Sequence, residues 1–351
     1  MDAVTKTPPV VRPPNSSSLI DANKDLEIAS TQPPVQHRRR DAFIPGFRDR
    51  PPFIQWLRRN WLDIATQLLC LLTSFLIYTF SPPLLPRYFP LYPGIERSGF
   101  GRKYGQPYMG EYVSTLTSAI VSFGAPAAIL GAIALWGTRR FRDGNAALIG
   151  LGYALATATL FQSFMKILIG GLRPHFLSIC APSIPPSRLG LNTPGPSNHL
   201  YFTASQVCTG EKGKIKEAQM SFPSGHACAA FAGFGFLALW LNAHLKVFGR
   251  ELRSGFPHTT GASKIESNAV EEKQLDDGRH RGRIQHWKLV VFAAPLCIAF
   301  LLASSKIRDG WHHPVDIIFG GLVGTAFAHM AYRMVYRSVY NWRNNHIPME
   351  K

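Results

Sequence analysis

Long apolar stretches alternate with polar segments along this chain of 351 residues. Six apolar stretches stand out, and most approach the ~20 residues that an α-helix needs to cross a bilayer. The fifth is the shortest, which is typical of a tilted or thinly flanked span. The pattern predicts an all-α polytopic membrane protein with six transmembrane helices, at residues 61–80, 113–136, 146–169, 227–247, 289–303 and 315–336.

Polar segments flank and interrupt these spans. Residues 1–60 are rich in proline, serine and arginine without an apolar period, which predicts a disordered basic cytosolic tail. Residues 61–336 would form the six-span domain, within which 249–287 predicts a disordered cytosolic loop of mixed charge. Residues 337–351 predict a short cytosolic tail, and we expect no removable signal peptide.

The placement of charge decides what the net charge of +17 means, since only 17% of residues are charged and 46% are hydrophobic. With a cytosolic N-terminus, the inward segments carry most of the arginines outside the motifs described below. The positive-inside rule therefore favours both termini in the cytosol. The excess of basic residues then reflects the orientation of the chain in the membrane and contact with anionic lipids of the bilayer. We expect no nucleic-acid partner.

Five cysteines show no metal-ligand spacing. Cys70, Cys228 and Cys297 lie in or near spans and are expected to be small apolar packing residues. Cys180 and Cys208 share the long outward loop. They can pair in an oxidising compartment or remain free thiols, and the sequence leaves both states open.

Charged residues and histidines gather at the ends of four predicted spans. Lys166 and Arg173 lie near the end of the third span, Ser224-Gly225-His226 stands at the start of the fourth, and 305–316 joins the fifth to the sixth. Counting crossings from a cytosolic start brings all of them to the outer face, whereas a cluster at an opposite end would lie ~30 Å away. The sequence therefore predicts one outward-facing site.

Each cluster also has a structural explanation. Lys166 and Arg173 could be snorkelling residues that mark the edge of the span. Lys166, however, lies inside an apolar run, where a charge costs ~2.5–3.5 kcal/mol on insertion scales, so a functional partner is favoured. Ser224 could be the N-cap of a helix, but capping and phosphate binding use the same free N–H groups, so both roles are compatible.

The segment before the last span carries the strongest chemical signal. If Pro314 begins the following helix, where its missing N–H costs nothing, His312 and Asp316 fall one turn apart at a helix N-terminus. That end of a helix suits a phosphate group. A histidine oriented by a carboxylate, with Lys306 and Arg308 before it, is the outline of a nucleophile for phosphoryl transfer.

Together these residues resemble the signature of the type 2 phosphatidic acid phosphatase superfamily. Six spans after an N-terminal tail are similar to its lipid phosphate phosphatase branch, in particular the fungal-type phosphatidate and diacylglycerol pyrophosphate phosphatases. One departure is Lys306, where the family has arginine, because lysine loses the planar two-pronged contact with phosphate. Arg308 is an alternative donor. The resemblance covers about 61–336 and reads Lys166 to Arg173-Pro174, then Pro223-Ser224-Gly225-His226, then Ser305-Lys306 through His312 to Asp316.

The resemblance implies a helical-bundle phosphatase core and a role for each residue. His312 would attack phosphorus and form a phosphohistidine, Asp316 would orient the ring, and His226 would protonate the leaving oxygen. We expect no metal and no cofactor, because several fixed cations can neutralise the phosphate. The phosphate-binding residues would be Lys166, Arg173, Ser224, Gly225, Lys306 and Arg308.

We therefore expect an integral membrane phosphatase for phosphatidate, lysophosphatidate or diacylglycerol pyrophosphate, with its site on the lumenal or extracellular face. A sphingoid-base phosphate or a polyisoprenyl diphosphate is an alternative substrate. A non-catalytic binder or transporter of lipid phosphates on the same scaffold is a further alternative, but retention of both His226 and His312 argues against it. Organelle and oligomeric state leave no signature in the sequence.

Overall fold

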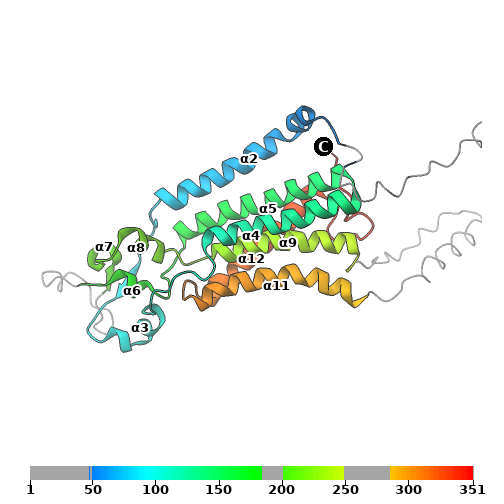
Figure 1. The fold of residues 1–351 in the computed structure, drawn as a ribbon. Helices are drawn as coiled ribbons and strands as arrows, with labels where there is room; N and C mark the ends of the chain where they lie inside the picture. The colour runs from blue at the N-terminus through cyan, green and yellow to red at the C-terminus, as the bar shows by residue number, and fades with distance from the viewer. Residues whose placement is uncertain (1–46, 48–49, 184–200, 249–284, 351) are drawn as a thin grey trace, which may run out of the picture. The chain divides into compact units, whose positions relative to one another are not determined.

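A computed structural model describes residues 47, 50–183, 201–248 and 285–350, and Figure 1 shows its fold. Six of its helices are long and apolar enough to cross a membrane, which confirms the six predicted spans and the all-α class. Almost all of the predicted N-terminal tail before the first span, and nearly all of the predicted loop at 249–287, lie outside the described residues. The six helices are α2 (Phe53–Phe80), α4 (Thr115–Ala132) with its π-helical continuation η3 (Ile133–Thr138), α5 (Phe141–Leu168), α9 (Gly225–Leu245), α11 (His286–Arg308) and α12 (Pro314–Val335).

Two helices extend further than their apolar stretches. Helix α2 begins at Phe53, within the segment that we assigned to the tail. Pro51 and Pro52 directly precede this helix, and the helix packs on α5. The Trp56 indole N–H donates to the Asn145 side-chain oxygen at 2.6 Å. Helix α11 fills the fifth span completely, because polar residues at both ends continue the helix beyond the apolar run.

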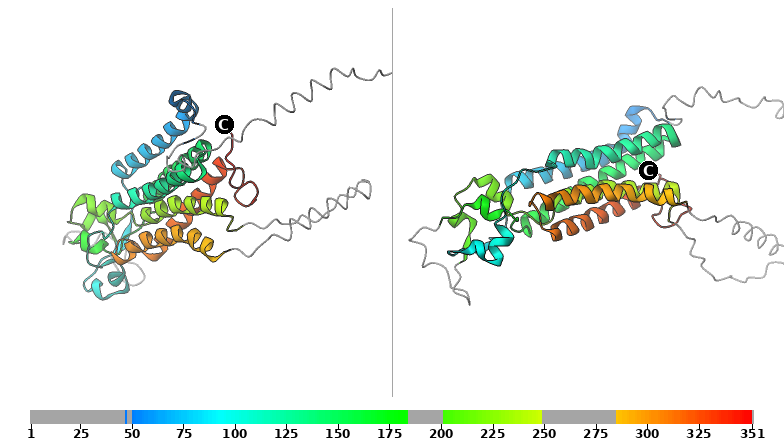
Figure 2. Two further views of the ribbon diagram at one scale, coloured as in Figure 1. Left: turned by 45° about the vertical axis from the view of Figure 1, so that its right-hand side comes forward. Right: turned by 60° about the horizontal axis from the view of Figure 1, so that its bottom comes forward.

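Helix α9 is the centre of the bundle and packs against α4, α5, α11 and α12. Small residues allow this close packing: a side chain at Gly324 of α12 would overlap the backbone carbonyl oxygen of Cys228 in α9. Helix α2 lies outermost and packs chiefly on α5, as the views in Figures 1 and 2 agree. It therefore exposes most of its length to the surrounding lipid.

A small folded cap covers the end of the bundle where α5 ends and α9 begins, and the sequence did not predict it. Its core buries Phe89, Phe176 and Phe202 completely or almost so. A disulfide joins Cys180 to Cys208, which resolves the alternative left open above in favour of pairing. The cap consists of β1 (Tyr88–Pro90) paired antiparallel with β2 (Tyr201–Thr203), η2 (Ile95–Arg97), α3 (Gly99–Tyr104), α6 (Phe176–Cys180), α7 (Ala204–Val207) and α8 (Lys212–Ala218).

The opposite end of the bundle is closed by the C-terminal segment, which folds back rather than trailing as a tail. The Met349 N–H donates to the Val335 carbonyl at 2.9 Å, and the Tyr332 hydroxyl donates to the Asn345 carbonyl at 2.7 Å. The Lys246 ammonium also binds the Asn345 side-chain oxygen, at 2.8 Å. These contacts attach residues 345–349 to the ends of α9 and α12.

Candidate active site

The loop between α11 and α12 is fixed by its helix ends. Helix α11 ends in a Schellman motif: the Trp311 N–H donates to the Lys306 carbonyl at 3.0 Å, and the Gly310 N–H donates to the Ile307 carbonyl at 3.1 Å. Gly310 adopts the left-handed conformation that this motif requires, with φ 68°. Pro314 is the first residue of α12, as predicted, so only a short and rigid connection carries His312.

His312 lies against Asp316, one helical turn away. The His312 Nδ1 and Asp316 Oδ2 atoms are 3.5 Å apart, and both side chains are buried. The same carboxylate oxygen accepts a hydrogen bond from the Ser221 hydroxyl at 2.5 Å and one from the His313 backbone N–H at 3.0 Å. Asp316 is therefore held from two further sides, so that it can orient the imidazole of His312.

The environment of His312 favours its neutral form. Burial lowers the pKa of the His312 imidazole well below its usual range. The contact with Asp316 opposes this shift, whereas the positive charges of Arg173 and Lys166 lower the pKa further. A base with a lowered pKa keeps its lone pair to more acidic pH, so the ring is unprotonated at neutral pH.

The second histidine, His226, comes from the first turn of α9. Ser224 is the N-cap of this helix, and its hydroxyl accepts from the Ala227 N–H at 3.4 Å. The Ser224 N–H donates to the Asp316 carbonyl at 3.1 Å, which joins the tips of α9 and α12. Within the described part of the chain, the buried Nε2 atom of His226 has no hydrogen-bond partner.

Two cations face these histidines. Arg173 is only 3% exposed; its Nη2 lies 3.2 Å from Glu217 Oε1, and its guanidinium lies 4.6 Å from the Trp311 ring centre. The Nε and Nη1 atoms of Arg173 are buried and unpartnered among the residues that the structure describes. Lys166 is also buried, near the end of α5, with its ammonium 5.8 Å from the Tyr78 ring centre.

These groups line one cavity of about 300 Å³. Its polar end combines unpaired N–H donors with two imidazoles, a combination that suits a tetrahedral oxyanion. Its other walls come from Leu71 and Phe75 of α2 and Ala119 of α4, so an apolar path leads from the cations toward the lipid-exposed helix. The predicted site residues in the lining are Lys166, Arg173, Gly225, His226 and His312.

Asp316 and Ser224 are not part of the lining; they contact residues of the site from behind it. The two remaining predicted phosphate-binding residues, Lys306 and Arg308, occupy different positions relative to the cavity. Lys306 is fully buried, and its ammonium donates to the Val113 carbonyl at 2.5 Å and lies 3.4 Å from Glu111 Oε1. Glu111 lines the cavity, so Lys306 lies at its margin, against that carboxylate.

The structure does not bring Arg308 into the cavity. Its side chain is exposed and its guanidinium lies 4.5 Å from the Tyr112 ring centre. Two residues along a helix turn the side chain by about 200°, so Lys306 and Arg308 face opposite sides of α11. Of the two alternatives for the missing family arginine, Lys306 is the one near the site.

Sequence reasoning missed several residues of the site, among them Trp311, Ser221, Glu217, Tyr78 and Glu111. Trp311 and Ser221 lie within or beside the sequence motifs, so their positions in the chain could have identified them as site residues. Glu217 and Tyr78 offered no such signal, because Glu217 reaches the cavity only through α8 of the cap. The Tyr78 hydroxyl donates to Glu217 at 3.1 Å, and Lys216 binds the Tyr78 and Thr79 carbonyls at 3.0 and 2.8 Å, which docks the cap on the end of α2.

Comparison with known proteins identifies a family for this chain. Residues 147–340, more than half of the chain, match the PAP2 superfamily. The chain is 28% identical over 200 residues to lipid phosphate phosphatase 1 of Arabidopsis thaliana, covering 57% of this chain and 47% of that protein. It is 31% identical over 190 residues to diacylglycerol pyrophosphate phosphatase 1 of Saccharomyces cerevisiae, covering 54% and 51%. The chain thus spans about half the length of the curated relatives it matches, and no solved structure matches it significantly.

The lowered pKa of His312 can be measured by nitrogen-15 NMR on histidine-labelled protein in detergent, with the resonance assigned by its loss in His312→Ala. We expect the ring to stay neutral from about pH 8 to about pH 5, although an ordinary histidine titrates near 6.5. A His312 resonance with a midpoint near that ordinary value would contradict the burial described here.

The unpartnered donors of Arg173 predict anion binding. We expect Arg173→Gln to weaken the binding of orthovanadate, a phosphate analogue, by about tenfold or more, because hydrogen bonds to charged groups contribute ~1.5–3 kcal/mol. Arg308→Gln is the matched control and should leave binding unchanged, because Arg308 lies outside the cavity. Titration calorimetry on the purified variants measures both. Equal losses would show that vanadate responds to overall charge rather than to this cavity.

Proposed function

The chain belongs to the PAP2 superfamily, and from this membership we propose that it is an integral membrane lipid phosphate phosphatase. The observation that carries the proposal is the shared cavity. His312 and His226 line it together with the unpaired N–H groups of Arg173. A binding protein for lipid phosphates needs the cations, but it has no use for two imidazoles that face the same anion, one placed as a nucleophile and one as an acid.

In the first step His312 attacks phosphorus. Asp316 lies on the Nδ1 side of the ring, which favours the tautomer with the proton on Nδ1 and leaves the Nε2 lone pair for the attack. The Nε2–P bond forms as the ester P–O bond breaks. His226, protonated in the complex with the phosphate dianion, gives its proton to the leaving oxygen, so the lipid departs as a neutral alcohol.

In the second step water hydrolyses the phosphohistidine. The neutral His226 left by the first step takes a proton from the attacking water, the O–P bond forms, and the P–Nε2 bond breaks. Inorganic phosphate leaves and His312 regains its lone pair. Both histidines are then restored, and no other co-reactant is required.

Fixed positive charge supplies most of the stabilisation of the transferring group. Arg173 and Lys166 would hold the non-bridging oxygens together with the Gly225 N–H at the start of α9. Glu217 and Tyr78 would position Arg173, and Lys306 would act through Glu111 at the margin. We include no metal, because these cations lie where a metal would otherwise neutralise charge.

The substrate would be a membrane lipid with a terminal phosphate. The apolar wall formed by Leu71, Phe75 and Ala119 would take the upper parts of acyl chains while the phosphate enters the cation cluster. The names of the relatives, lipid phosphate phosphatase and diacylglycerol pyrophosphate phosphatase, support phosphatidate and diacylglycerol pyrophosphate as the first compounds to test.

We further propose that the site faces the lumen or the cell exterior and that both termini are cytosolic. Two observations support this orientation. Arginines that include Arg59, Arg142 and Arg337 lie at the end of the bundle opposite His312, as the positive-inside rule favours for a cytosolic face. The Cys180–Cys208 disulfide lies in the cap, at the site's end of the bundle, and such bonds persist in oxidising compartments.

Removing the nucleophile tests the enzyme proposal. We expect His312→Ala to reduce phosphate release from phosphatidate in mixed micelles by at least about 10³-fold, and His226→Ala by about 10²- to 10⁴-fold. His329→Ala is the control: His329 lies in α12 far from the site, against Tyr340, and its loss should leave the rate unchanged. Unchanged phosphate release by His312→Ala would overturn the proposal and leave a lipid-phosphate binder.

A further inference from the structure

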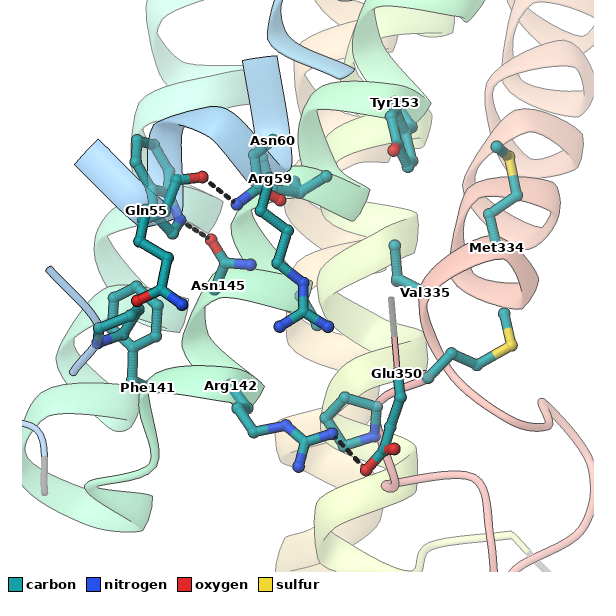
Figure 3. Close-up of a pocket in the computed structure, with 16 residues that line it drawn as sticks. Gln55, Arg59, Asn60, Phe141, Arg142, Asn145, Tyr153, Met334, Val335 and Glu350 are labelled. Atoms are coloured by element: carbon teal, nitrogen blue, oxygen red, sulfur yellow. Dashed lines mark hydrogen bonds and ion pairs between the residues drawn. The ribbon is translucent and has the colours of Figure 1, made fainter. Parts of the chain in front are cut away.

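A second cavity lies at the end of the bundle opposite His312. It has a volume of about 410 Å³, and Figure 3 shows the residues around it. They come from the start of α2, the start of α5, the end of α12 and residues 348–350. None of them takes part in the reaction proposed above, so the cavity needs an explanation of its own.

The polar part of this cavity is positively charged. Its charged lining residues are Arg59, Arg142 and Glu350, and Figure 3 shows both guanidinium groups extending into the space near the carboxylate. Arg142 Nη2 lies 2.7 Å from Glu350 Oε1, and both side chains are well exposed. Arg142 lowers the pKa of the Glu350 carboxyl, chiefly by this hydrogen bond, and Arg337 and Arg59 add to the effect. The guanidinium groups of Arg142, Arg337 and Arg59 therefore all act on this one carboxylate.

The remaining lining is mostly apolar and aromatic, with the amide side chains of Gln55, Asn60 and Asn145 among it. The Trp56 indole is fixed by its hydrogen bond to Asn145, and the Asn60 side chain is buried against the Trp56 carbonyl at 2.9 Å. Because α2 packs chiefly on α5, this part of the cavity lies beside an outer helix that is largely exposed. The larger apolar lining residues include Trp56, Phe141, Ile149, Tyr153, Met334 and Met349.

We propose that this cavity binds an anionic phospholipid that is not a substrate, in the leaflet opposite the His312 site. Its phosphodiester would replace the Glu350 carboxylate on Arg142 and also meet Arg59. The two guanidinium groups in the lining suit the negatively charged oxygens of a phosphodiester. The apolar walls would hold the glycerol end and the first methylenes of the acyl chains, an area that a free phosphate ion could not use. In the proposed orientation this leaflet is the cytosolic one, where anionic lipids attract basic groups.

Phosphatidylglycerol is a suitable probe, because it lacks the terminal phosphate that the His312 site requires. Native mass spectrometry of the full chain in detergent, with dioleoylphosphatidylglycerol added, measures the affinity of the adduct. We expect the double variant Arg59→Gln/Arg142→Gln to bind at least about tenfold more weakly. Glu350→Gln should bind more tightly than the original chain, because it removes the competing carboxylate.

The matched control is Arg58→Gln/Arg333→Gln. It removes the same charge from two exposed residues, one near the start of α2 and one near the end of α12, that do not line the cavity. Its affinity should equal that of the original chain. Equal losses in the two double variants, or complete displacement of the lipid by inorganic phosphate, would overturn the proposal.

A second readout covers the case in which the double variant fails to fold. Phosphatidylglycerol with brominated acyl chains should quench tryptophan fluorescence saturably, and Trp56→Phe should remove the saturable part because Trp56 lines the cavity. Unchanged saturable quenching in Trp56→Phe would contradict the assigned position of the lipid.

Discussion

The burial of incompletely paired positive charge is the constraint on which the site depends. Arg173 is almost fully buried, yet only one of its three nitrogen atoms has a partner among the described residues, the carboxylate of Glu217. A buried charge of this kind is costly unless its remaining donors are satisfied. The donors of Arg173 open into the cavity that also holds His226 and His312, so a bound oxyanion would complete them. The protein thus maintains an unfavourable arrangement that a phosphate group would relieve.

Rigid helix ends keep these charges in place. The Schellman motif fixes the end of α11, Pro314 begins α12, and the Ser224 N–H joins α9 to α12 through the Asp316 carbonyl. Close packing at Gly324 holds α9 and α12 together below the site. Helix α9 packs against the four other inner helices, which hold the helix that carries His226, whereas α2 packs chiefly on α5 at the lipid side. In the proposed function, this arrangement would combine a fixed site for the phosphate with an outer wall for the acyl chains.

Much of this could be predicted from the sequence, for identifiable reasons. The length of each apolar stretch predicts a membrane span, and the number of preceding spans predicts on which membrane face each helix end lies. Counting the spans therefore predicted that Lys166, Arg173, His226 and His312 lie at the same face. The contacts that polar loops make leave no repeating pattern in the sequence. For this reason the cap, Glu217 and the folded C-terminal segment were missed. Arg308 was grouped with Lys306 by proximity along the chain, although helical geometry turns it away. The length of α11 was underestimated because polar residues extend a helix beyond its apolar core.

An experimental structure of the full chain with orthovanadate would test the central claim most directly. Vanadate adopts the five-coordinate geometry of phosphoryl transfer, so it reports the positions of nucleophile and acid together. We predict vanadium at covalent distance from His312 Nε2, with Arg173 and Lys166 on its equatorial oxygens and His226 on the side opposite the nucleophile. Vanadate bound elsewhere, or bound in this cavity with the His312 ring turned away from it, would contradict the account.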